Sequence, residues 1–293
     1  MPITADPSAD PTPRPGPRPM ASRRARVVSN EVVRGGCHVL RLEPEAPLPT
    51  VRAGQFAMLS AEHPSFPILP RPFSVLGWRP AADGAPEQLE FLIMPVGRGS
   101  GVLCGLPVGG EVQVVAPMGC AFDVDVPAGP VVAVAGGYGV APFLFLAETW
   151  AATGDPRLAD LTVVFGARTD ERLSLVDRLE AAGCRVLACT EDGSRGFHGR
   201  VDACLRDELA AKPTSLVFTC GPEAMMEAVG EVSRAAGVPC RASLETVMGC
   251  GYAVCNGCAV AVGDPSDPEG YTYELACREG TVFDEARLQW QLI

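Results

Sequence analysis

Four cysteines near the C-terminus have the spacing of an iron–sulfur site. Three of them form a Cys-x4-Cys-x2-Cys run and the fourth follows after 18 further residues, which gives Cys250, Cys255, Cys258 and Cys277. Four thiolates in this order hold a plant-type [2Fe-2S] centre, which transfers electrons one at a time. Gly249, Gly251 and Gly257 lie beside them, and glycines let backbone N–H groups approach cluster sulfurs closely. The segment therefore predicts a centre for single-electron transfer.

A structural zinc site and a set of buried free thiols are the alternatives for these cysteines. Zinc knuckles usually contain two Cys-x2-Cys pairs, whereas this segment has one, so the spacing favours the cluster. Disulfides are disfavoured because the chain has 12 cysteines and no secretory signal, which indicates a reducing compartment. The other cysteines are interpreted as small core residues, among them Cys37, Cys104, Cys184 and Cys204.

Composition bounds the class of protein. A chain of 293 residues that is 47% hydrophobic can bury two substantial cores, so more than one domain is expected. No apolar run approaches the roughly 18 to 20 residues of a membrane span, which predicts a soluble, cytoplasmic protein with no membrane partner. The formal net charge of -11 argues against nucleic acid as a partner. The sequence also lacks the paired acid/base pattern of a hydrolase.

The chain changes character along its length, which predicts a tail and three folded parts. Residues 1–25 are Pro-rich and are expected to form a disordered tail. Residues 26–127 contain short alternating runs separated by Gly and Pro, as in an antiparallel β-barrel or sandwich. These runs lie at 25–28, 38–42, 56–60, 73–76, 89–94 and 111–115. Residues 239–293 hold the cysteines and are expected to form a small cluster module.

Residues 128–238 alternate between strand and helix patterns. The expected strands are 131–135, 161–167, 184–190 and 215–220, and the expected helices are 141–153, 173–182, 201–211 and 222–236. Strands that alternate with helices form a parallel, doubly wound sheet. This part therefore predicts an α/β nucleotide-binding domain.

A glycine turn follows the first strand of the α/β part. Gly136, Gly137 and Gly139 stand where the strand gives way to a helix. Such a turn permits close backbone approach, and the helix N-terminus offers free N–H groups to a pyrophosphate. Pro142 replaces the last glycine of a G-x-G-x-x-G pattern, so a plain structural turn is the alternative.

A second marker ends the last predicted strand of the α/β part, where Cys220, Gly221 and Pro222 lead into a helix. Ligands bind outside the carboxyl ends of parallel strands, so Cys220 is expected at the mouth of the crevice. The alternative is a small strand-end residue that packs beneath the turn.

The β part contains one stretch with the residues to bind a diphosphate and a flat ring. An arginine can clamp a diphosphate, a serine hydroxyl can bond the ring edge, and a glycine-serine turn can donate N–H groups to phosphate. By itself such a run is also compatible with an edge strand that has a charged tip. The residues are Arg71, Pro72, Phe73 and Ser74, followed by Gly99 and Ser100.

Taken in order, RPFS, the Gly-Ser turn, GGYGVAP and CGPEAMM resemble the flavin-dependent ferredoxin-NADP reductase superfamily. In that superfamily a β-barrel binds FAD and an α/β domain binds the nicotinamide nucleotide. The run SLETVMGCGYAVCNGCAV with the later CREGTVF is similar to the iron–sulfur electron transfer subunits of type B dihydroorotate dehydrogenases. The resemblance covers residues 26–293.

The resemblance implies which residues bind each cofactor. It implies a cluster held by the four cysteines and a nicotinamide nucleotide on the turn and the strand end described above. It implies FAD contacts from Arg71, Pro72, Phe73, Ser74, Leu92, Ile93, Met94, Gly99 and Ser100. The chain departs from the family at Ala135, where a third glycine is common, and at Tyr138, where a small aliphatic residue is common.

The resemblance also implies a function in pyrimidine (UMP) biosynthesis. Electrons would pass from the FMN of a separate dihydroorotate dehydrogenase subunit through [2Fe-2S] and FAD to NAD+, and no residue of this chain would act on dihydroorotate. The partners would assemble as a dimer of heterodimers. Two alternatives are a reductase module of a hydrogenase, ferredoxin or glutamate-synthase-like system, and a non-catalytic zinc-bearing scaffold.

The choice between NADH and NADPH stays open at the level of the residues. Arg168 could meet a 2'-phosphate, whereas Asp170 or Glu171 could meet a ribose hydroxyl. The expectation of NAD comes from the resemblance alone.

Overall fold

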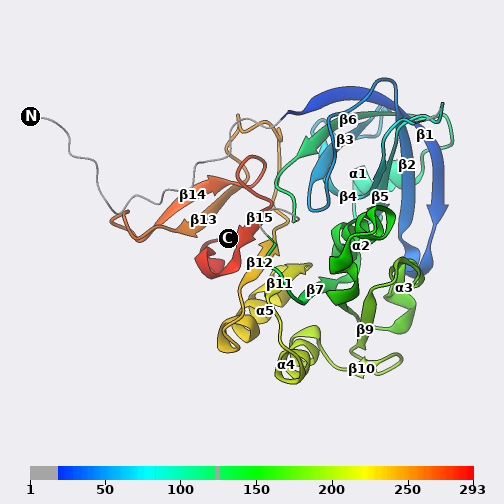
Figure 1. The fold of residues 1–293 in the computed structure, drawn as a ribbon. Coiled ribbons are helices and arrows are strands. Elements are labelled where there is room, and N and C mark those ends of the chain that lie inside the picture. Colours follow the sequence, from blue (N-terminus) through cyan, green and yellow to red (C-terminus); the bar gives the residue numbers. More distant parts are fainter. Residues whose placement is uncertain (1–18, 83, 123–125) are drawn as a thin grey trace, which may run out of the picture.

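The first folded part is a closed antiparallel barrel (Figure 1). The computed structural model describes residues 19–82, 84–122 and 126–293, so residues 1–18 of the expected tail lie outside the described residues. The barrel strands run in the order β1-β2-β5-β4-β3-β6. They are β1 (Ala21–Val32), β2 (His38–Pro44), β3 (Phe56–Ala61), β4 (Arg71–Arg79), β5 (Gln88–Ile93) and β6 (Glu111–Met118), with the short helix α1 (Arg98–Cys104) after β5.

All six barrel strands overlap the alternating runs that the sequence predicts. Alternate residues point into a packed interior, where Leu40, Leu42, Leu89 and Phe91 are 0% exposed. The first strand begins earlier than expected, at Ala21, because its start pairs with β6 and closes the barrel.

The second part is a seven-stranded sheet in the order β10-β9-β8-β7-β11-β12-β15. Every neighbouring pair is parallel except β12 with β15. The strands are β7 (Val131–Gly136), β8 (Leu161–Ala167), β9 (Arg185–Thr190), β10 (Phe197–His198), β11 (Leu216–Cys220), β12 (Cys240–Ser243) and β15 (Val282–Asp284). The central strands are almost wholly apolar, as parallel strands covered by helices on both faces must be.

Four helices connect these strands. They are α2 (Ala141–Thr153), α3 (Val176–Ala182), α4 (Val201–Ala211) and α5 (Glu223–Ala235). Helices α2 and α3 lie toward the barrel, whereas α4 and α5 lie together at the far side of the sheet (Figure 1). Helix α2 packs on β4, so the barrel and the sheet share an interface. The predicted architecture of barrel plus doubly wound sheet is confirmed.

The cysteine segment is built onto the end of the sheet. Strand β12, within the segment expected to form the cluster module, pairs with β11, and β15 returns to pair with β12. Between them lie the cysteine loop and a hairpin of β13 (Ala259–Gly263) and β14 (Tyr271–Leu275). Glu285 is 1% exposed and accepts hydrogen bonds from Arg234 on α5 at 2.6 Å and from Trp290 at 2.8 Å. These bonds fix the C-terminal segment on the sheet domain.

Within the parts of the chain that the structure describes, no helix is both long and apolar enough to cross a membrane.

Candidate functional site

The barrel opens beside the start of β4. Residues 71–74 pair only with β3, and β4 gains its second partner, β5, from Val75 onward. Proline has no backbone N–H group, so Pro72 leaves no donor without a partner at this edge. A cavity of about 360 Å³ lies against this open edge, within the size range of ordinary ligand sites.

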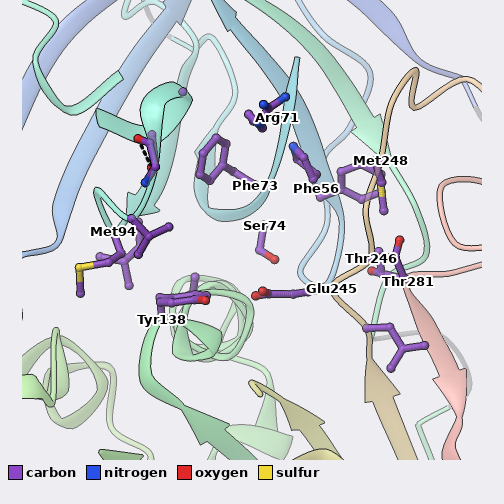
Figure 2. A pocket seen from close by; sticks show the side chains of 18 of the residues that line it. Phe56, Arg71, Phe73, Ser74, Met94, Tyr138, Glu245, Thr246, Met248 and Thr281 are labelled. Atoms are coloured by element: carbon purple, nitrogen blue, oxygen red, sulfur yellow. Dashed lines mark hydrogen bonds between the residues drawn. The ribbon is translucent and has the colours of Figure 1, made fainter. Parts of the chain in front are cut away.

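Most of the predicted flavin contacts line this cavity (Figure 2). Ile93 does not, because it alternates into the barrel core and is 0% exposed. The residues that line it are Arg71, Pro72, Phe73, Ser74, Leu92, Met94, Gly99 and Ser100. Residues far apart in the sequence are thus gathered in one place, and their contact with FAD stays a prediction.

Close packing fixes the rim of the cavity. A Cβ atom at Gly99 would lie 3.2 Å from Cγ of Arg71, so the arginine stem packs closely against this glycine. The guanidinium Nη1 donates to the carbonyl oxygen of Leu69 at 3.0 Å, which leaves further N–H groups for an anion. The Ser100 hydroxyl accepts from the N–H of Gly97 at 3.0 Å and so steadies the turn that precedes α1.

The far wall of the cavity comes from a segment that sequence reasoning did not assign to the flavin. It consists of Leu244, Glu245, Thr246 and Met248, with Thr281 beside them. The Thr246 hydroxyl oxygen is buried and has no hydrogen-bond partner among the described residues. Burial raises the pKa of Glu245. The signal that could have identified this wall is its position, directly before the first cysteine.

These observations fit a flavin, and this cavity is called the flavin-type cavity below. A buried hydroxyl without a partner calls for a polar ligand atom, while Phe73, Leu92 and Met94 provide apolar surface for a ring. Arg71 at the rim provides positive charge for a diphosphate.

A second cavity, of about 780 Å³, lies at the carboxyl ends of the parallel strands and is called the nucleotide cavity below. Gly136, Gly137 and Pro222 line it, and their contact with a nucleotide stays a prediction. Gly139 and Gly221 lie behind its wall, with the Cβ position of Gly139 only 2.4 Å from the Cys220 carbonyl oxygen. These glycines let the turn pack against the end of β11.

Cys220 lines neither cavity, although the sequence placed it at the mouth of the crevice. It is 1% exposed, and burial is the main cause that raises the pKa of its thiol. The structure places it as a small residue beneath the turn, and its contact with the nucleotide stays a prediction.

The charges around the second cavity differ from those that the sequence suggested. Asp170 is held by Arg34 and by Arg195, and the Arg34 hydrogen bond is the main cause that lowers the pKa of its carboxyl group. Neither Asp170 nor Glu171 lines the cavity. Glu191 does, together with three basic side chains, Arg168, Arg172 and Arg200.

The four cysteines form two pairs. The Sγ atoms of Cys258 and Cys277 lie 3.2 Å apart and both residues are buried, whereas Cys250 is half-buried and interacts with the exposed Cys255. Cys258 and Cys277 are the inner pair, and Cys250 and Cys255 are the outer pair. Backbone N–H groups point at the outer pair, with Tyr252 N 3.2 Å from the Cys250 sulfur. Burial alone would raise the pKa of Cys250, but these N–H groups outweigh it and lower the pKa to about 7.

This pairing fits a two-iron cluster better than one zinc ion. A zinc site gathers its ligands around a single point, and no three His, Cys, Asp or Glu side chains of the described ranges gather in that way. A [2Fe-2S] cluster instead takes two thiolates on each iron. The inner and outer cysteine pairs provide that arrangement.

The cluster loop and the flavin-type cavity share walls. Met248 lines the cavity and stands two residues before Cys250, so their Cα atoms are at most about 7 Å apart. A Cβ atom at Gly251 would lie 2.7 Å from Met58 Cγ and 3.0 Å from Met118 Cε, so the loop rests directly on the barrel. Cofactors bound at the two sites would be close neighbours.

Comparisons with known proteins agree with these sites. A family model described as an oxidoreductase NAD-binding domain matches residues 133–231, and one described as the iron–sulfur cluster binding domain of dihydroorotate dehydrogenase B matches residues 245–289. The dihydroorotate dehydrogenase B (NAD(+)) electron transfer subunit of Caldanaerobacter subterraneus subsp. tengcongensis is 32% identical over 260 residues, which are 89% of this chain and 95% of that protein. The chain belongs to the family of dihydroorotate dehydrogenase B electron transfer subunits.

A second relative is the probable dihydroorotate dehydrogenase B electron transfer subunit of Methanocaldococcus jannaschii. It is 34% identical over 223 residues, which are 74% of this chain and 80% of that protein. The resemblance predicted from the sequence motifs is therefore confirmed.

Solved structures share the fold. An NADH-dependent reduced ferredoxin-NADP oxidoreductase has a TM-score of 0.74 at 24% identity, covering 91% of this chain and 90% of its own. A ferredoxin reductase of carbazole 1,9a-dioxygenase has a TM-score of 0.64 at 19% identity, covering 76% and 68%. At these identities the likeness concerns the barrel and the sheet.

Proposed function

We propose that this chain is the electron transfer subunit of an NAD-linked dihydroorotate dehydrogenase in pyrimidine (UMP) biosynthesis. Electrons enter from the FMN of a separate catalytic subunit and leave on NAD+ after passing through a [2Fe-2S] cluster and FAD. The relatives named as electron transfer subunits support the function. Assembly as a dimer of heterodimers is proposed from the sequence resemblance.

The observation that carries this proposal is the direct connection between the cysteine pairs and the flavin-type cavity. The segment from Glu245 to Met248 forms the cavity wall and then continues into the first cluster ligand, Cys250. Flavins exchange one or two electrons, so bound FAD links a two-electron nicotinamide to a one-electron cluster. A chain that places the two sites side by side is suited to this conversion.

Each part of the chain has a binding task. Arg71 holds the diphosphate of FAD at the rim, and Ser74 and Thr246 offer hydroxyl groups to the ring. Gly136 and Gly137 admit the nicotinamide nucleotide to the strand ends. The cysteine loop directs backbone N–H groups at the sulfurs, which stabilises negative charge there.

Cofactor content tests the assignment of the sites. Anaerobically purified protein should contain one flavin and about two irons per chain, because four thiolates in two pairs hold a two-iron cluster. Cys255→Ser should remove the iron and the electron paramagnetic resonance signal of the reduced cluster while flavin stays bound. The reason is that Cys255 lies outside the lining of the flavin-type cavity.

Cys104→Ser is the matched control, since Cys104 is a free, partly buried cysteine of the barrel domain that should leave both cofactors in place. Stoichiometric zinc without iron in the wild-type protein would contradict the cluster assignment.

A further inference from the structure

Tyr138 lies where the two cavities meet. Only three residues of the described chain line both the flavin-type cavity and the nucleotide cavity, namely Met94, Val96 and Tyr138. Met94 and Val96 belong to the barrel domain, directly after β5, whereas Tyr138 comes from the glycine turn of the sheet domain. A ligand that reaches from one cavity into the other must therefore pass between Tyr138 and the barrel.

The backbone on both sides of Tyr138 is fixed. Gly137 has a φ of 55°, in the left-handed region, and Gly139 is pressed against the end of β11. The tyrosine is thereby held out at the junction and is 44% exposed, although neighbouring Val140 and Ala141 are buried. Figure 2 shows its ring at the edge of the flavin-type cavity, below Ser74 and beside Met94.

A carboxyl group faces the phenol. Figure 2 shows the phenol oxygen of Tyr138 and the carboxyl group of Glu245 pointing toward each other across the cavity. The charge of Glu245 is the main cause that raises the pKa of Tyr138.

We propose that Tyr138 is a gate: its ring fills the passage through which the nicotinamide must enter to reach the flavin, so nicotinamide entry competes with the ring. This assignment rests on the function proposed above for the identity of the two ligands. The rest of the nucleotide binds in the part of the nucleotide cavity that Arg168, Arg172 and Arg200 line, and these three residues line only that cavity. Tyr138 thus opposes binding of the nicotinamide end and does not affect binding of the rest of the nucleotide.

The expected effect follows from population shift. When only a fraction of the molecules has the ring displaced, the observed dissociation constant is the intrinsic one divided by that fraction. Removal of the ring should therefore tighten binding of NAD+. It should leave unchanged the binding of ADP-ribose, which has no nicotinamide.

The test is isothermal titration calorimetry of the flavin-loaded full chain with NAD+ and, separately, with ADP-ribose. For Tyr138→Ala we expect NAD+ to bind about threefold to tenfold more tightly and ADP-ribose to bind as in the wild type. This range corresponds to a wild-type ring that leaves the passage open in about a third to a tenth of the molecules. Tyr138→Phe keeps the ring and should retain the wild-type constants for both ligands. Flavin content, measured by absorbance, confirms that each variant is folded.

Unchanged or weaker NAD+ binding by Tyr138→Ala would overturn the gate, the weaker result because it would make the ring a platform for the nicotinamide. Equal tightening by Tyr138→Phe, or a parallel change in ADP-ribose binding, would overturn it as well. A wild-type protein that binds neither ligand would instead contradict the proposed function. Failure of the gate and failure of the function are thus distinguishable.

Discussion

At the residue scale, the choice of nucleotide depends on four charged side chains around the larger cavity. Arg168, Arg172 and Arg200 bring positive charge, and Glu191 brings the only carboxylate among the described residues that line it. A carboxylate accepts hydrogen bonds from ribose hydroxyls and repels a 2'-phosphate. The arginines would attract that phosphate, and we expect the Glu191 carboxylate to oppose it and so to favour NADH over NADPH.

Glu191→Gln should therefore relax selection against NADPH. Removal of one like charge near the 2'-phosphate is expected to lower the dissociation constant for NADPH about fivefold and to change that for NADH little. The measurement is flavin reduction by each nucleotide in anaerobic stopped flow, with Glu171→Gln as the matched control outside the cavity. An unchanged ratio of the two dissociation constants would show that Glu191 does not distinguish the ribose hydroxyl of NADH from the 2'-phosphate of NADPH.

Residue-level prediction is simplest where the chemistry is local. The four cysteines are predicted as ligands from their spacing, because three of them share one short loop, and their role as ligands stays a prediction. The acidic residue of the nucleotide cavity was not found in this way. Asp170 stands after the expected strand, but its carboxylate is held by arginines from two other segments, and only the folded chain brings Glu191 to the cavity.

At the scale of elements, a buried carboxylate joins the barrel to the sheet domain. Glu90 on β5 is 4% exposed and accepts hydrogen bonds from Arg41 at 2.8 Å and from Arg178 of α3 at 3.0 Å. Arg178 also bonds Glu148 of α2 at 2.8 Å. Burial alone would raise the pKa of Glu90, but the two arginines outweigh it and lower the pKa.

Glu90→Gln should lower the free energy of unfolding at pH 7 by about 1.5 to 3 kcal/mol, the range for hydrogen bonds to a charged group. The folded-state pKa lies below the unfolded value, so this stabilisation is present at neutral pH and is lost as the pH falls below about 4.5 and through the folded pKa. Urea unfolding at pH 7 and pH 4 measures it. Wild type and variant should differ less at the lower pH.

The control is Glu31→Gln, since Glu31 bonds the same Arg41 at 2.9 Å but its side chain is 59% exposed. It should change stability by less than about 1 kcal/mol. Equal effects of the two substitutions, or a pH-independent effect of Glu90→Gln, would contradict the role given to the buried ion pair.

Single elements could be predicted well, and their long-range partners could not. Helices α2 and α4 begin and end at the expected residues, because α2 ends at Gly154 in the left-handed conformation and α4 ends before Lys212 and Pro213. Strands β12 and β15 were not expected in the sheet. Each is short, and it becomes a strand through its neighbour in space and not through a local pattern.

At the scale of the whole molecule, the three sites form a continuous series. The nucleotide cavity meets the flavin-type cavity at Tyr138, and Met248 leads from the flavin-type cavity to the cysteine loop. The order of the motifs predicted which sites exist. That the loop rests on Met58 and Met118 of the barrel could not be predicted, because this contact joins segments far apart in the sequence.

The most direct test of the proposed function is anaerobic stopped-flow reduction of the bound flavin by dihydroorotate, with and without an FMN-containing dihydroorotate dehydrogenase catalytic subunit. The chain alone should be reduced by NADH and not by dihydroorotate, because its proposed sites bind FAD, a nicotinamide nucleotide and a cluster. Addition of the catalytic subunit should produce reduction by dihydroorotate, and NAD+ should then be reduced to NADH. Reduction by dihydroorotate without the partner, or none in its presence, would contradict the assignment of this chain as an electron transfer subunit.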